Sequence, residues 1–304
     1  MSDAPAVALA IDLGGTKASF AAIDAGGLVR ARSQRPSHEG GLALSLDALV
    51  TQARETVAAA GLEWGAVRAA GVVVPGIYSP DTGRAWAPNL WGKDELPLRD
   101  ELHARLPVPV RIDSDRSGYV LGEQWQGVAR GLRDVVFLAV GTGIGAGILA
   151  HGRLLRGCAG SAGAVGWLAL DPRWREEYGR VGAFEAEAAG PAFARRAGTA
   201  TAEQAADAAR RGDPAARRAV AETVEWLAMG VASLVSVLNP QIVVLGGGLM
   251  QARDLFLEPV RAAVLRWAQP LAAPRCRIEP TSLGEDAALF GAARLALLKD
   301  DGSQ

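Results

Sequence analysis

The chain has 304 residues, which corresponds to two domains at roughly 100–200 residues each. Its 49% hydrophobic and 21% charged residues are typical of a chain that buries a core, and they exclude a disordered protein. The net charge is −1, from 32 basic and 33 acidic residues, so no overall field attracts nucleic acid or an anionic membrane, and neither is expected as a partner.

The N-terminal part alternates short apolar segments with glycine turns. Strands are predicted over Val7–Ile11, Ala18–Ile23, a segment after Gly26-Gly27, Ala69–Val74 and Val108–Ile112. Between the third and fourth of these, residues 43–60 carry the apolar periodicity of an amphipathic helix. The last strand runs directly into the polar segment Asp113-Ser-Asp115.

The same pattern starts again in the second half of the chain. A strand is predicted over Asp134–Val140, a glycine turn over Gly141–Gly147 and a second strand over Ile148–Ala150. Gly14 and Gly141 therefore mark two copies of one unit, 127 positions apart (141 − 14). Further predicted elements are a turn at His151-Gly152 before Arg153–Arg156, solvated helices within 172–215, a helix over 216–238, a strand over Gln241–Leu245 and a closing helix over Asp286–Lys299.

Strands that alternate with helices predict an α/β fold. The duplicated unit predicts two similar domains that face a cleft. We expect the smaller domain to comprise residues 1–116 and about 288–304, and the larger domain residues 117–287.

Cysteine, histidine and hydropathy limit the chemistry further. The two cysteines, Cys158 and Cys276, cannot build a disulfide framework or a cysteine-rich metal site, and they predict a reduced, cytoplasmic protein. The three histidines restrict histidine-based catalysis. Residues 1–11 lack the features of a signal peptide, and no uninterrupted apolar run reaches about 18–20 residues, so we expect a soluble chain.

Two glycine turns are candidate phosphate-binding loops. The turn in Asp12-Leu-Gly-Gly-Thr-Lys17 exposes backbone N–H groups, and Thr16 and Lys17 add a hydroxyl and a cation. A plain hairpin turn is the alternative, but two such loops in duplicated units favour phosphate binding. The Walker pattern is absent, which excludes a P-loop NTPase.

The glycine-rich segments of the second half allow other interpretations. Gly141–Ala146 formally matches a dinucleotide fingerprint, but that motif requires a following helix, whereas this segment continues as a hairpin. Gly246-Gly-Gly248 follows a strand and suits contact with adenosine or phosphate, with a tight strand-to-helix turn as the alternative. Ala159–Gly163 resembles a nucleophile elbow only loosely, so a hydrolase is a weak rival.

Asp115 is the candidate catalytic carboxylate. It follows a strand at the junction of the two repeats, where it could accept a proton from a substrate hydroxyl. The alternative is an N-cap of the helix that starts near Arg116, a role that Asp and Ser both favour. From the residues alone, the cap is the better interpretation.

Together these motifs resemble the ROK family of bacterial sugar kinases, within the actin/hexokinase-like ATPase superfamily. The resemblance runs from Ile11 to about Ala293. Asp12–Lys17 is similar to the family's first phosphate loop, Gly141–Gly145 to its second and Gly246–Gly248 to its adenosine-side loop. The resemblance implies a two-domain actin/hexokinase-like (ribonuclease H-like) fold with an interdomain active-site cleft.

On the sugar side, Val74-Pro-Gly76 and Pro88-Asn-Leu-Trp91 resemble the segments that supply a backbone contact and an asparagine, here Asn89. Asp113–Ser117 stands in the place of the family's Glu-Asn-Asp-Ala-Asn. This match puts Asp115 on the catalytic base and raises that role above the cap.

The chain also departs from the family pattern. Where the family has Gly-Glu-x-Gly-His, Ala164 and Trp167 replace the glutamate and the histidine. The motif C-x-C-G-x-x-G-C-x-E keeps its Glu185, but its cysteine positions hold Glu176, Tyr178 and Ala183. Because zinc prefers cysteine and histidine ligands, the comparison with the motif implies that no structural zinc is bound. Ser114 replaces the asparagine before the base.

The resemblance implies an ATP-dependent kinase that phosphorylates the primary hydroxyl of a hexose-like ring. Asp115 would orient or deprotonate that hydroxyl, and Mg²⁺ would accompany ATP near Asp12. The residues that would bind phosphate or adenosine are Gly14, Gly15, Thr16, Lys17, Gly141, Thr142, Gly143, Gly246, Gly247 and Gly248. Those that would hold the ring are Gly76, Asn89, Ser114, Glu185 and Trp167.

The altered ring contacts favour a modified sugar, such as the amino sugar kanosamine or a C7 cyclitol of the valiolone type, in a family that also serves antibiotic and other natural-product pathways. Ordinary glucokinase activity is the alternative. A sugar-sensing regulator or degenerate kinase is the non-enzyme alternative, although the start at the first strand leaves no room for the family repressors' helix-turn-helix domain. A homodimer is expected, and the donor, ATP or polyphosphate, stays open.

Overall fold

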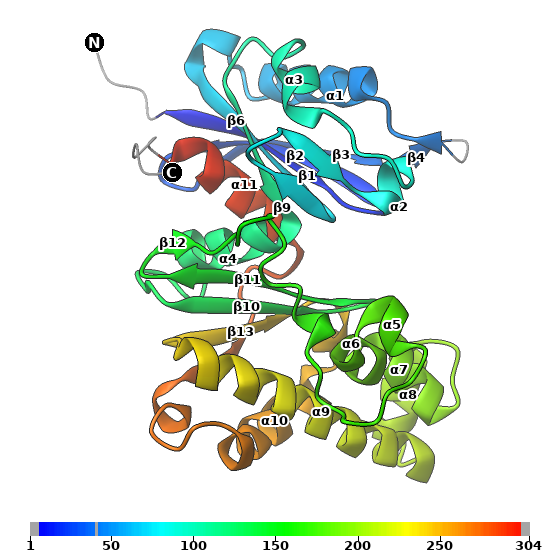
Figure 1. Cartoon of the computed structure of the whole chain (residues 1–304). Coiled ribbons are helices and arrows are strands. Elements are labelled where there is room, and N and C mark those ends of the chain that lie inside the picture. The colour runs from blue at the N-terminus through cyan, green and yellow to red at the C-terminus, as the bar shows by residue number, and fades with distance from the viewer. Residues whose placement is uncertain (1–5, 40–41, 299–304) are drawn as a thin grey trace. The chain divides into compact units, whose positions relative to one another are not determined.

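The chain forms two compact units in a computed structural model that describes residues 6–39 and 42–298 (Figure 1). Unit 1 comprises Met1–Arg130, Gly157–Ser161 and Glu285–Gln304, and unit 2 comprises Gly131–Arg156 and Ala162–Gly284. Unit 1 extends beyond the boundary predicted after residue 116, because helix α4 (Asp115–Gln126) packs along α11 (Ala287–Leu297) in the same unit.

Unit 1 is built on a five-stranded sheet in the order β3-β2-β1-β6-β9. Its strands are β1 (Val7–Leu13), β2 (Lys17–Asp24), β3 (Val29–Pro36), β6 (Val67–Val74) and β9 (Val110–Ser114). β1, β2 and β3 form an antiparallel meander, whereas β1, β6 and β9 run parallel. Two small hairpins, β4 (His38–Glu39) with β5 (Leu42–Ala43) and β7 (Ile77–Ser79) with β8 (Arg84–Trp86), complete the strands of the described residues in this unit.

Unit 2 repeats this plan in a sheet of order β12-β11-β10-β13-β14. Its strands are β10 (Val135–Val140), β11 (Ile144–Ala150), β12 (Arg153–Leu154), β13 (Ile242–Gly246) and β14 (Arg277–Pro280). As in unit 1, the first strand pairs antiparallel with the second and parallel with a later strand, here β10 with β11 and β13. The duplicated strand-turn-strand unit predicted from the two glycine turns is thereby confirmed.

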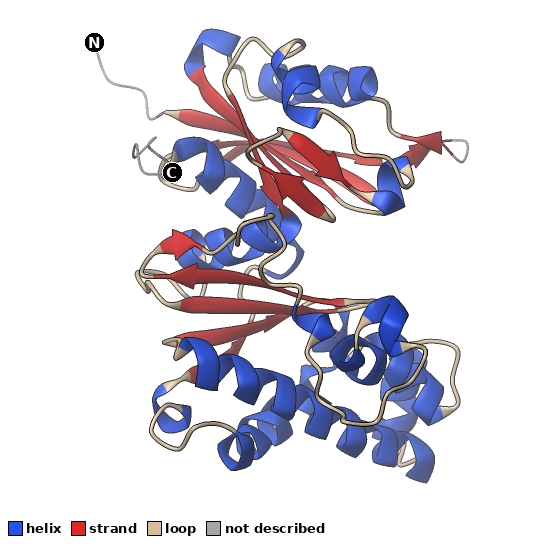
Figure 2. Cartoon of the chain, viewed as in Figure 1, coloured by secondary structure: helices blue, strands red, loops and turns tan. Residues whose placement is uncertain are grey.

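Helices cover the sheet of unit 1 on both faces, as Figure 2 shows. The helices are α1 (Leu46–Ala59), η1 (Trp64–Ala66), α2 (Pro88–Trp91), α3 (Leu98–His103), α4, η5 (Gly284–Asp286) and α11. Alternate residues of β1 point to opposite faces. Leu9 and Ile11 join a core with α1 and α3, and Ala8 and Ala10 join the alanine-rich face of α11.

Unit 2 buries its main core under α9. Its helices are η2 (Val165–Trp167), α5 (Tyr178–Val181), α6 (Ala183–Ala188), α7 (Gly190–Ala197), α8 (Ala202–Arg210), α9 (Pro214–Leu238), η3 (Gly248–Ala252), α10 (Arg253–Trp267) and η4 (Ala273–Arg275). By length and composition alone α9 could span a membrane, but half of its most apolar stretch is buried inside the unit, where it packs against α6, α7, α8 and α10. These contacts make α9 the central core helix of unit 2.

Most predicted elements occur with shifted ends. β11 begins at Ile144, inside the predicted glycine turn, because Gly145 and Gly147 pair with β10 and carry no side chains that oppose it. Of the segment Arg153–Arg156 that follows the predicted turn at His151-Gly152, only Arg153–Leu154 forms a strand, β12. α11 spans Ala287–Leu297, and Lys299 of the predicted closing helix lies outside the described residues.

Helices α4 and α11 pack closely through glycine. A Cβ atom built on Gly122 would lie 2.0 Å from the carbonyl oxygen of Ala287, and one on Gly291 would lie 1.8 Å from that of Gly118. No side chain larger than hydrogen fits at these positions unless the helices separate. The helix pair therefore holds the N-terminal end of α4, and Asp115 with it, in a fixed place.

We predict that Gly122→Ala lowers the free energy of unfolding by about 1–3 kcal/mol, because the added methyl group forces α4 away from α11. Gly65→Ala is the matched control, since nothing lies within 4 Å of a Cβ built there. Thermal or urea unfolding measures both variants. Equal midpoints for the two would show that the helix contact is not close-packed.

Candidate active site

Three parallel strands of unit 1 end at one edge of its sheet. Asp12 of β1 pairs with Val73 of β6, and Val74 of β6 pairs with Ser114 of β9. The loops that follow these strands therefore leave from the same edge, which is where open α/β sheets bind ligands. They carry the predicted residues Gly14, Gly76 and Asp115.

The first glycine loop is a tight turn with exposed backbone. The Gly14 N–H donates to the Lys17 carbonyl at 3.0 Å, and a Cβ on Gly14 would lie 2.7 Å from that oxygen. Gly15 and Thr16 are exposed. Ser37 fastens the loop from behind, because its hydroxyl donates to the Gly14 carbonyl and its N–H to the Thr16 carbonyl.

Lys17 takes part in an ion pair on the surface of unit 1. Its ammonium nitrogen lies 2.8 Å from Oε2 of Glu285. Burial and the charge of Asp115 raise the pKa of Asp12, and the positive charge of Lys17 opposes this rise. Glu285 and Ser37 were not predicted as neighbours of this loop, since both are distant from it in the chain and belong to no motif.

The structure separates the two interpretations of Asp115. The side chain of Ser114 accepts the Ser117 N–H and is the N-cap of α4, while Asp115 is the first helical residue. Oδ1 of Asp115 accepts the N–H of Arg116 at 2.8 Å. Because Ser114 supplies the cap, the carboxylate of Asp115 is not needed for it.

Two other titratable groups, Asp12 and Tyr119, lie near Asp115. Burial raises the pKa of Asp115 to about 6, against the opposing effect of the Arg116 guanidinium and backbone N–H. Burial, followed by the charge of Asp115, raises the pKa of Asp12 to about 7. The same burial and the two carboxylates raise the pKa of Tyr119. Two carboxylates that hinder each other's ionisation near neutral pH are typical of a proton-transfer or cation-binding site.

The segment after β6 lies within reach of α4. Nη2 of Arg116 donates to the Gly76 carbonyl at 3.3 Å. Gly76 has φ of 146° and a Cβ there would lie 2.1 Å from the Trp86 carbonyl oxygen, so the position requires glycine. Asn89 is exposed on α2, and its carbonyl oxygen lies 3.1 Å from Nε2 of His38. Arg116 was missed by the sequence argument, although its place directly after the base was a usable signal.

Unit 2 carries the second glycine loop, held by Glu185. The Gly141 N–H donates to the Gly143 carbonyl at 2.9 Å, and the Ile144 N–H donates to Oε2 of Glu185 at 2.7 Å. A Cβ on Gly143 would lie 2.8 Å from the same carboxylate oxygen. Burial raises the pKa of Glu185, opposed by the Ile144 hydrogen bond.

A cavity of about 290 Å³ opens beside this loop, close to the lower limit of roughly 300 Å³ for ligand sites. It is lined by Gly141, Thr142, Gly190, Pro191, Ala194, Ala200, Thr201, Ala202, Glu203, Gly248 and Leu249. Gly247 and Gly248 are exposed. Gly246 is buried against the Phe137 ring, which a Cβ at this position would approach to 2.2 Å. The starts of α7 and α8 were not predicted as part of this site. The Gly190-Pro191 pair at a helix start was the available signal.

Trp167 and Ala164 are exposed on the segment that faces Glu185. A Cβ on Gly166 would lie 3.1 Å from Cβ of Glu185, and one on Gly182 would lie 2.6 Å from Cα of Trp167. Backbone of the 164–167 segment therefore packs close to Glu185, and Trp167 in this segment is 57% exposed.

The residues at the family's zinc positions do not fit zinc. Trp167 and Ala183 offer no ligand atom, and the hydroxyl of Tyr178 donates to Glu187 at 2.7 Å. Zinc requires about four cysteine, histidine or carboxylate ligands in tetrahedral arrangement. Among the described residues, no three histidine, cysteine or acidic side chains are grouped to hold a metal ion.

Comparison with known proteins identifies the family. The model of the ROK family matches residues 8–299. The chain belongs to the ROK family. The glucokinase of Thermotoga maritima is 32% identical over 246 residues, 74% of this chain and 78% of that protein. The predicted α/β fold is confirmed by solved ROK structures, of which two are similar over 95% of this chain.

The first of these is the ROK hexokinase from Thermus thermophilus, with a TM-score of 0.82, 30% identity and 97% of that chain covered. The second is a ROK glucokinase from Streptomyces griseus in complex with glucose and AMPPNP, with a TM-score of 0.76, 27% identity and 98% of that chain covered.

We predict that the purified ROK protein contains no stoichiometric zinc and that chelators leave its Tm unchanged, because the family's ligand positions hold Trp167, Glu176, Tyr178 and Ala183. Elemental analysis and thermal melting with and without EDTA measure this. One zinc ion per chain, or a Tm that falls on chelation, would contradict it.

Proposed function

We propose that this ROK protein is an ATP-dependent sugar kinase that transfers the γ-phosphoryl group to the primary hydroxyl of a hexose-like ring. The observation that carries the proposal is the carboxylate of Asp115, partly buried, with a raised pKa, and free of any capping role at the sheet edge that also carries the Gly14–Lys17 loop. Membership of the ROK family and the glucokinase and hexokinase relatives support the reaction class.

Asp115 acts on the acceptor hydroxyl. A carboxylate with a pKa of about 6 is mostly ionised at neutral pH and still basic enough to accept a proton. The Arg116 side chain and backbone N–H hold Asp115 in its ionised form and fix its direction. Because the transition state of phosphoryl transfer is loose, this orientation matters as much as the proton transfer itself.

In each unit, the backbone N–H groups of the exposed loop residues, Gly15 and Thr16 in unit 1 and Thr142 and Gly143 in unit 2, bind phosphate oxygens, while the N–H groups of Gly14 and Gly141 close the turns. The cavity beside Gly141 and Gly248 takes the adenosine end of the donor, between the starts of α7 and α8. The lining of this cavity is partly apolar, with Pro191, Ala194 and Leu249. An apolar lining suits the adenine ring of a nucleotide better than a polyphosphate chain, which is charged along its whole length.

Asp12 fits a magnesium ion that enters with the nucleotide. Its oxygen donors suit Mg²⁺, and the repulsion from Asp115 that raises the pKa of Asp12 is relieved by a cation. Bound Mg²⁺ supplies charge neutralisation for the phosphates. Asp12 would hold it through water, and no protein cage for a metal occurs among the described residues.

The residues proposed to contact the sugar ring are Gly76, Asn89 and Ser114 in unit 1, and Glu185 and Trp167 in unit 2. Ala164 and Trp167 stand in place of the glutamate and histidine of the family motif, and Glu185 is the charged residue of these motifs that remains. An amino-hexose such as kanosamine, which can pair with Glu185, or a C7 cyclitol fits these residues better than glucose. Ordinary glucose phosphorylation is the alternative. A regulator without activity has no use for a base with a raised pKa.

We also propose a cytoplasmic homodimer. The described residues hold both cysteines as free thiols, which fits a reducing compartment. Several apolar side chains of unit 2 are exposed, among them Val237, Leu265, Trp267 and Leu271. Such side chains support an interface with a second copy.

Asp115→Asn is expected to lower kcat by about 10²–10⁴-fold, because it removes the base and keeps its shape. In the wild type, kcat/KM for the sugar should fall as the pH drops below about 6, where Asp115 takes up a proton. ADP release coupled to NADH oxidation measures both. Retention of more than about a tenth of wild-type kcat, or a flat pH profile from pH 8 to 5, would contradict the role of Asp115.

Stability measurements control for misfolding of this variant. The raised pKa means that the contribution of Asp115 to stability is fully present below its unfolded pKa and is lost as the pH rises through about 6. At pH 8 the asparagine variant should therefore melt at the same temperature as the wild type or above it. A lower Tm would show that the variant is destabilised, and the loss of activity could then not be assigned to the missing base.

We predict that kcat/KM for glucose is lower than for an amino-hexose or a C7 cyclitol, since each hydroxyl left unpaired beside Ala164 and Trp167 costs about 1–3 kcal/mol. The assay compares glucose, kanosamine, glucosamine, mannose and a valiolone. The double variant Ala164→Glu/Trp167→His restores the family side chains and should shift the ranking towards glucose. Glucose ranking first in the wild type would overturn the substrate proposal and leave the kinase assignment in place.

A further inference from the structure

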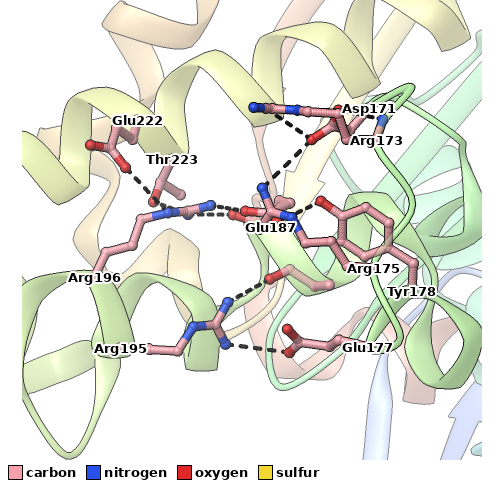
Figure 3. A network of polar contacts seen from close by, with 11 residues as sticks. Asp171, Arg173, Arg175, Glu177, Tyr178, Glu187, Arg195, Arg196, Glu222 and Thr223 are labelled. Carbon is pink, nitrogen blue, oxygen red and sulfur yellow. Dashed lines mark hydrogen bonds and ion pairs between the residues drawn. The ribbon is translucent and has the colours of Figure 1, made fainter.

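Helix α6 carries two glutamates with opposite surroundings. Glu185 reaches the second glycine loop, where Oε2 accepts the Ile144 N–H at 2.7 Å. Glu187, two residues later, is buried with 5% of its side chain exposed, and it points into a cluster of arginines (Figure 3). The orientation of one carboxylate in this short helix therefore constrains the other.

Three donors saturate the Glu187 carboxylate. Oε1 accepts Nη1 of Arg175 at 2.6 Å and the hydroxyl of Tyr178 at 2.7 Å, and Oε2 accepts Nη2 of Arg196. Arg196, whose side chain is 14% exposed, also donates to the Glu187 carbonyl and lies within hydrogen-bond distance of Thr223. A buried carboxylate requires such partners, and here they come from different segments.

A chain of ion pairs passes through Glu187. Arg175 joins Glu187 to Asp171, which also pairs with Arg173, and Arg196 joins Glu187 to Glu222. A neighbouring pair, Arg195 with Glu177, shares no ion-pair partner with this chain. These residues lie on the 171–178 segment and on α6, α7 and α9 (Figure 3). The network ties the short α6 to its neighbours on both sides.

The α7 arginines also hold the last carbonyls of α6. Nη2 of Arg195 donates to the Ala186 carbonyl at 3.0 Å, next to the Arg196 bond to the Glu187 carbonyl. These bonds satisfy C-terminal carbonyls that the helix leaves free, and the cations complement its dipole. Directly after α6, the Gly190 N–H donates to the Gly141 carbonyl at 2.8 Å.

From this arrangement we infer that Glu187 is a positioning residue for Glu185 and that its arginine–tyrosine network organises α6 in place of the metal that the family pattern implies. Tyr178 stands at one of the family's cysteine positions, and its hydroxyl is bonded to Glu187. The network fixes where the Glu185 carboxylate meets the substrate ring, so this inference rests on the proposed sugar kinase function.

Glu187→Gln tests the inference, because it removes the charge and keeps the size. We expect KM for the sugar to rise about tenfold or more, as for other residues that orient a ligand-binding group, with a smaller change in KM for ATP. Glu177→Gln is the matched control: it removes a neighbouring ion pair, to Arg195 at 3.4 Å, that shares no ion-pair partner with Glu187. Its KM values should stay at the wild-type level.

A double-mutant cycle separates positioning from general loss of structure. In the background of Glu185→Ala, the further change Glu187→Gln should leave KM for the sugar unchanged, because the group that it positions is gone. Independent, multiplying effects of the two substitutions would overturn the inference. If Glu187→Gln does not fold, Tyr178→Phe removes a single bond to the same carboxylate, and a sugar KM at the wild-type value in this variant would overturn it as well.

Hydrogen exchange gives a readout that does not depend on catalysis. In Glu187→Gln, the amide of Ile144 and those of residues 183–188 should exchange faster than in the wild type and in Glu177→Gln. Unchanged exchange would overturn the positioning role. A wild-type protein that phosphorylates no sugar, combined with faster exchange in Glu187→Gln, would refute the kinase proposal and retain the role of the network.

Discussion

The parallel pairing of β1 with β6 and of β6 with β9 is the constraint on which the rest of unit 1 depends. Its register brings Asp12, Gly76 and Asp115 to one sheet edge from positions that are far apart in the sequence. The same pairing removes the two carboxylates from water and raises the pKa values of both. The fold therefore carries an electrostatic cost at this edge, and it is held there by the close contact between α4 and α11.

Unit 2 uses the same strand order for a different purpose. Its first strand also ends in a glycine turn, and its parallel neighbour β13 runs into Gly246–Gly248. In unit 1 the third parallel strand, β9, is followed by Asp115, whereas β14, at the same place in the sheet of unit 2, is followed by Thr281. Glycine at both strand ends leaves exposed backbone and the space of the cavity beside Gly141. The duplicated topology thus places Asp115, the proposed proton acceptor, in one unit and the cavity beside Gly141, the proposed nucleotide site, in the other, so the two loops look alike while their surroundings differ.

Local pattern was enough to predict most strands of the two main sheets, the glycine turns and the repeat, because hydrophobic periodicity and turn residues depend on neighbouring positions. It did not predict β7, β8 or β14. It was not enough to decide between Ser114 and Asp115 as the cap of α4, since both residue types serve and only the backbone conformation separates them. Ser37, Glu285 and the start of α7 were missed because their partners are remote in sequence. The unit boundary moved for the same reason: α4 belongs with α11, a helix more than 150 residues further along the chain.

The network around Glu187 shows how a fold can replace one kind of constraint with another. A buried ion pair adds little net stability, because desolvation offsets most of the attraction between its charges. It is, however, demanding in direction: two guanidinium groups and a phenol accept only a narrow range of carboxylate orientations. A metal ion fixes its ligands in a comparable way through bond angles. Packing by apolar side chains alone could hold α6 as firmly, but it would leave the rotation of the helix less defined. The rotation of α6 about its axis decides whether the Glu185 carboxylate reaches the Gly143–Ile144 turn. The bonds to Glu187 on the same helix therefore fix the rotation that Glu185 needs.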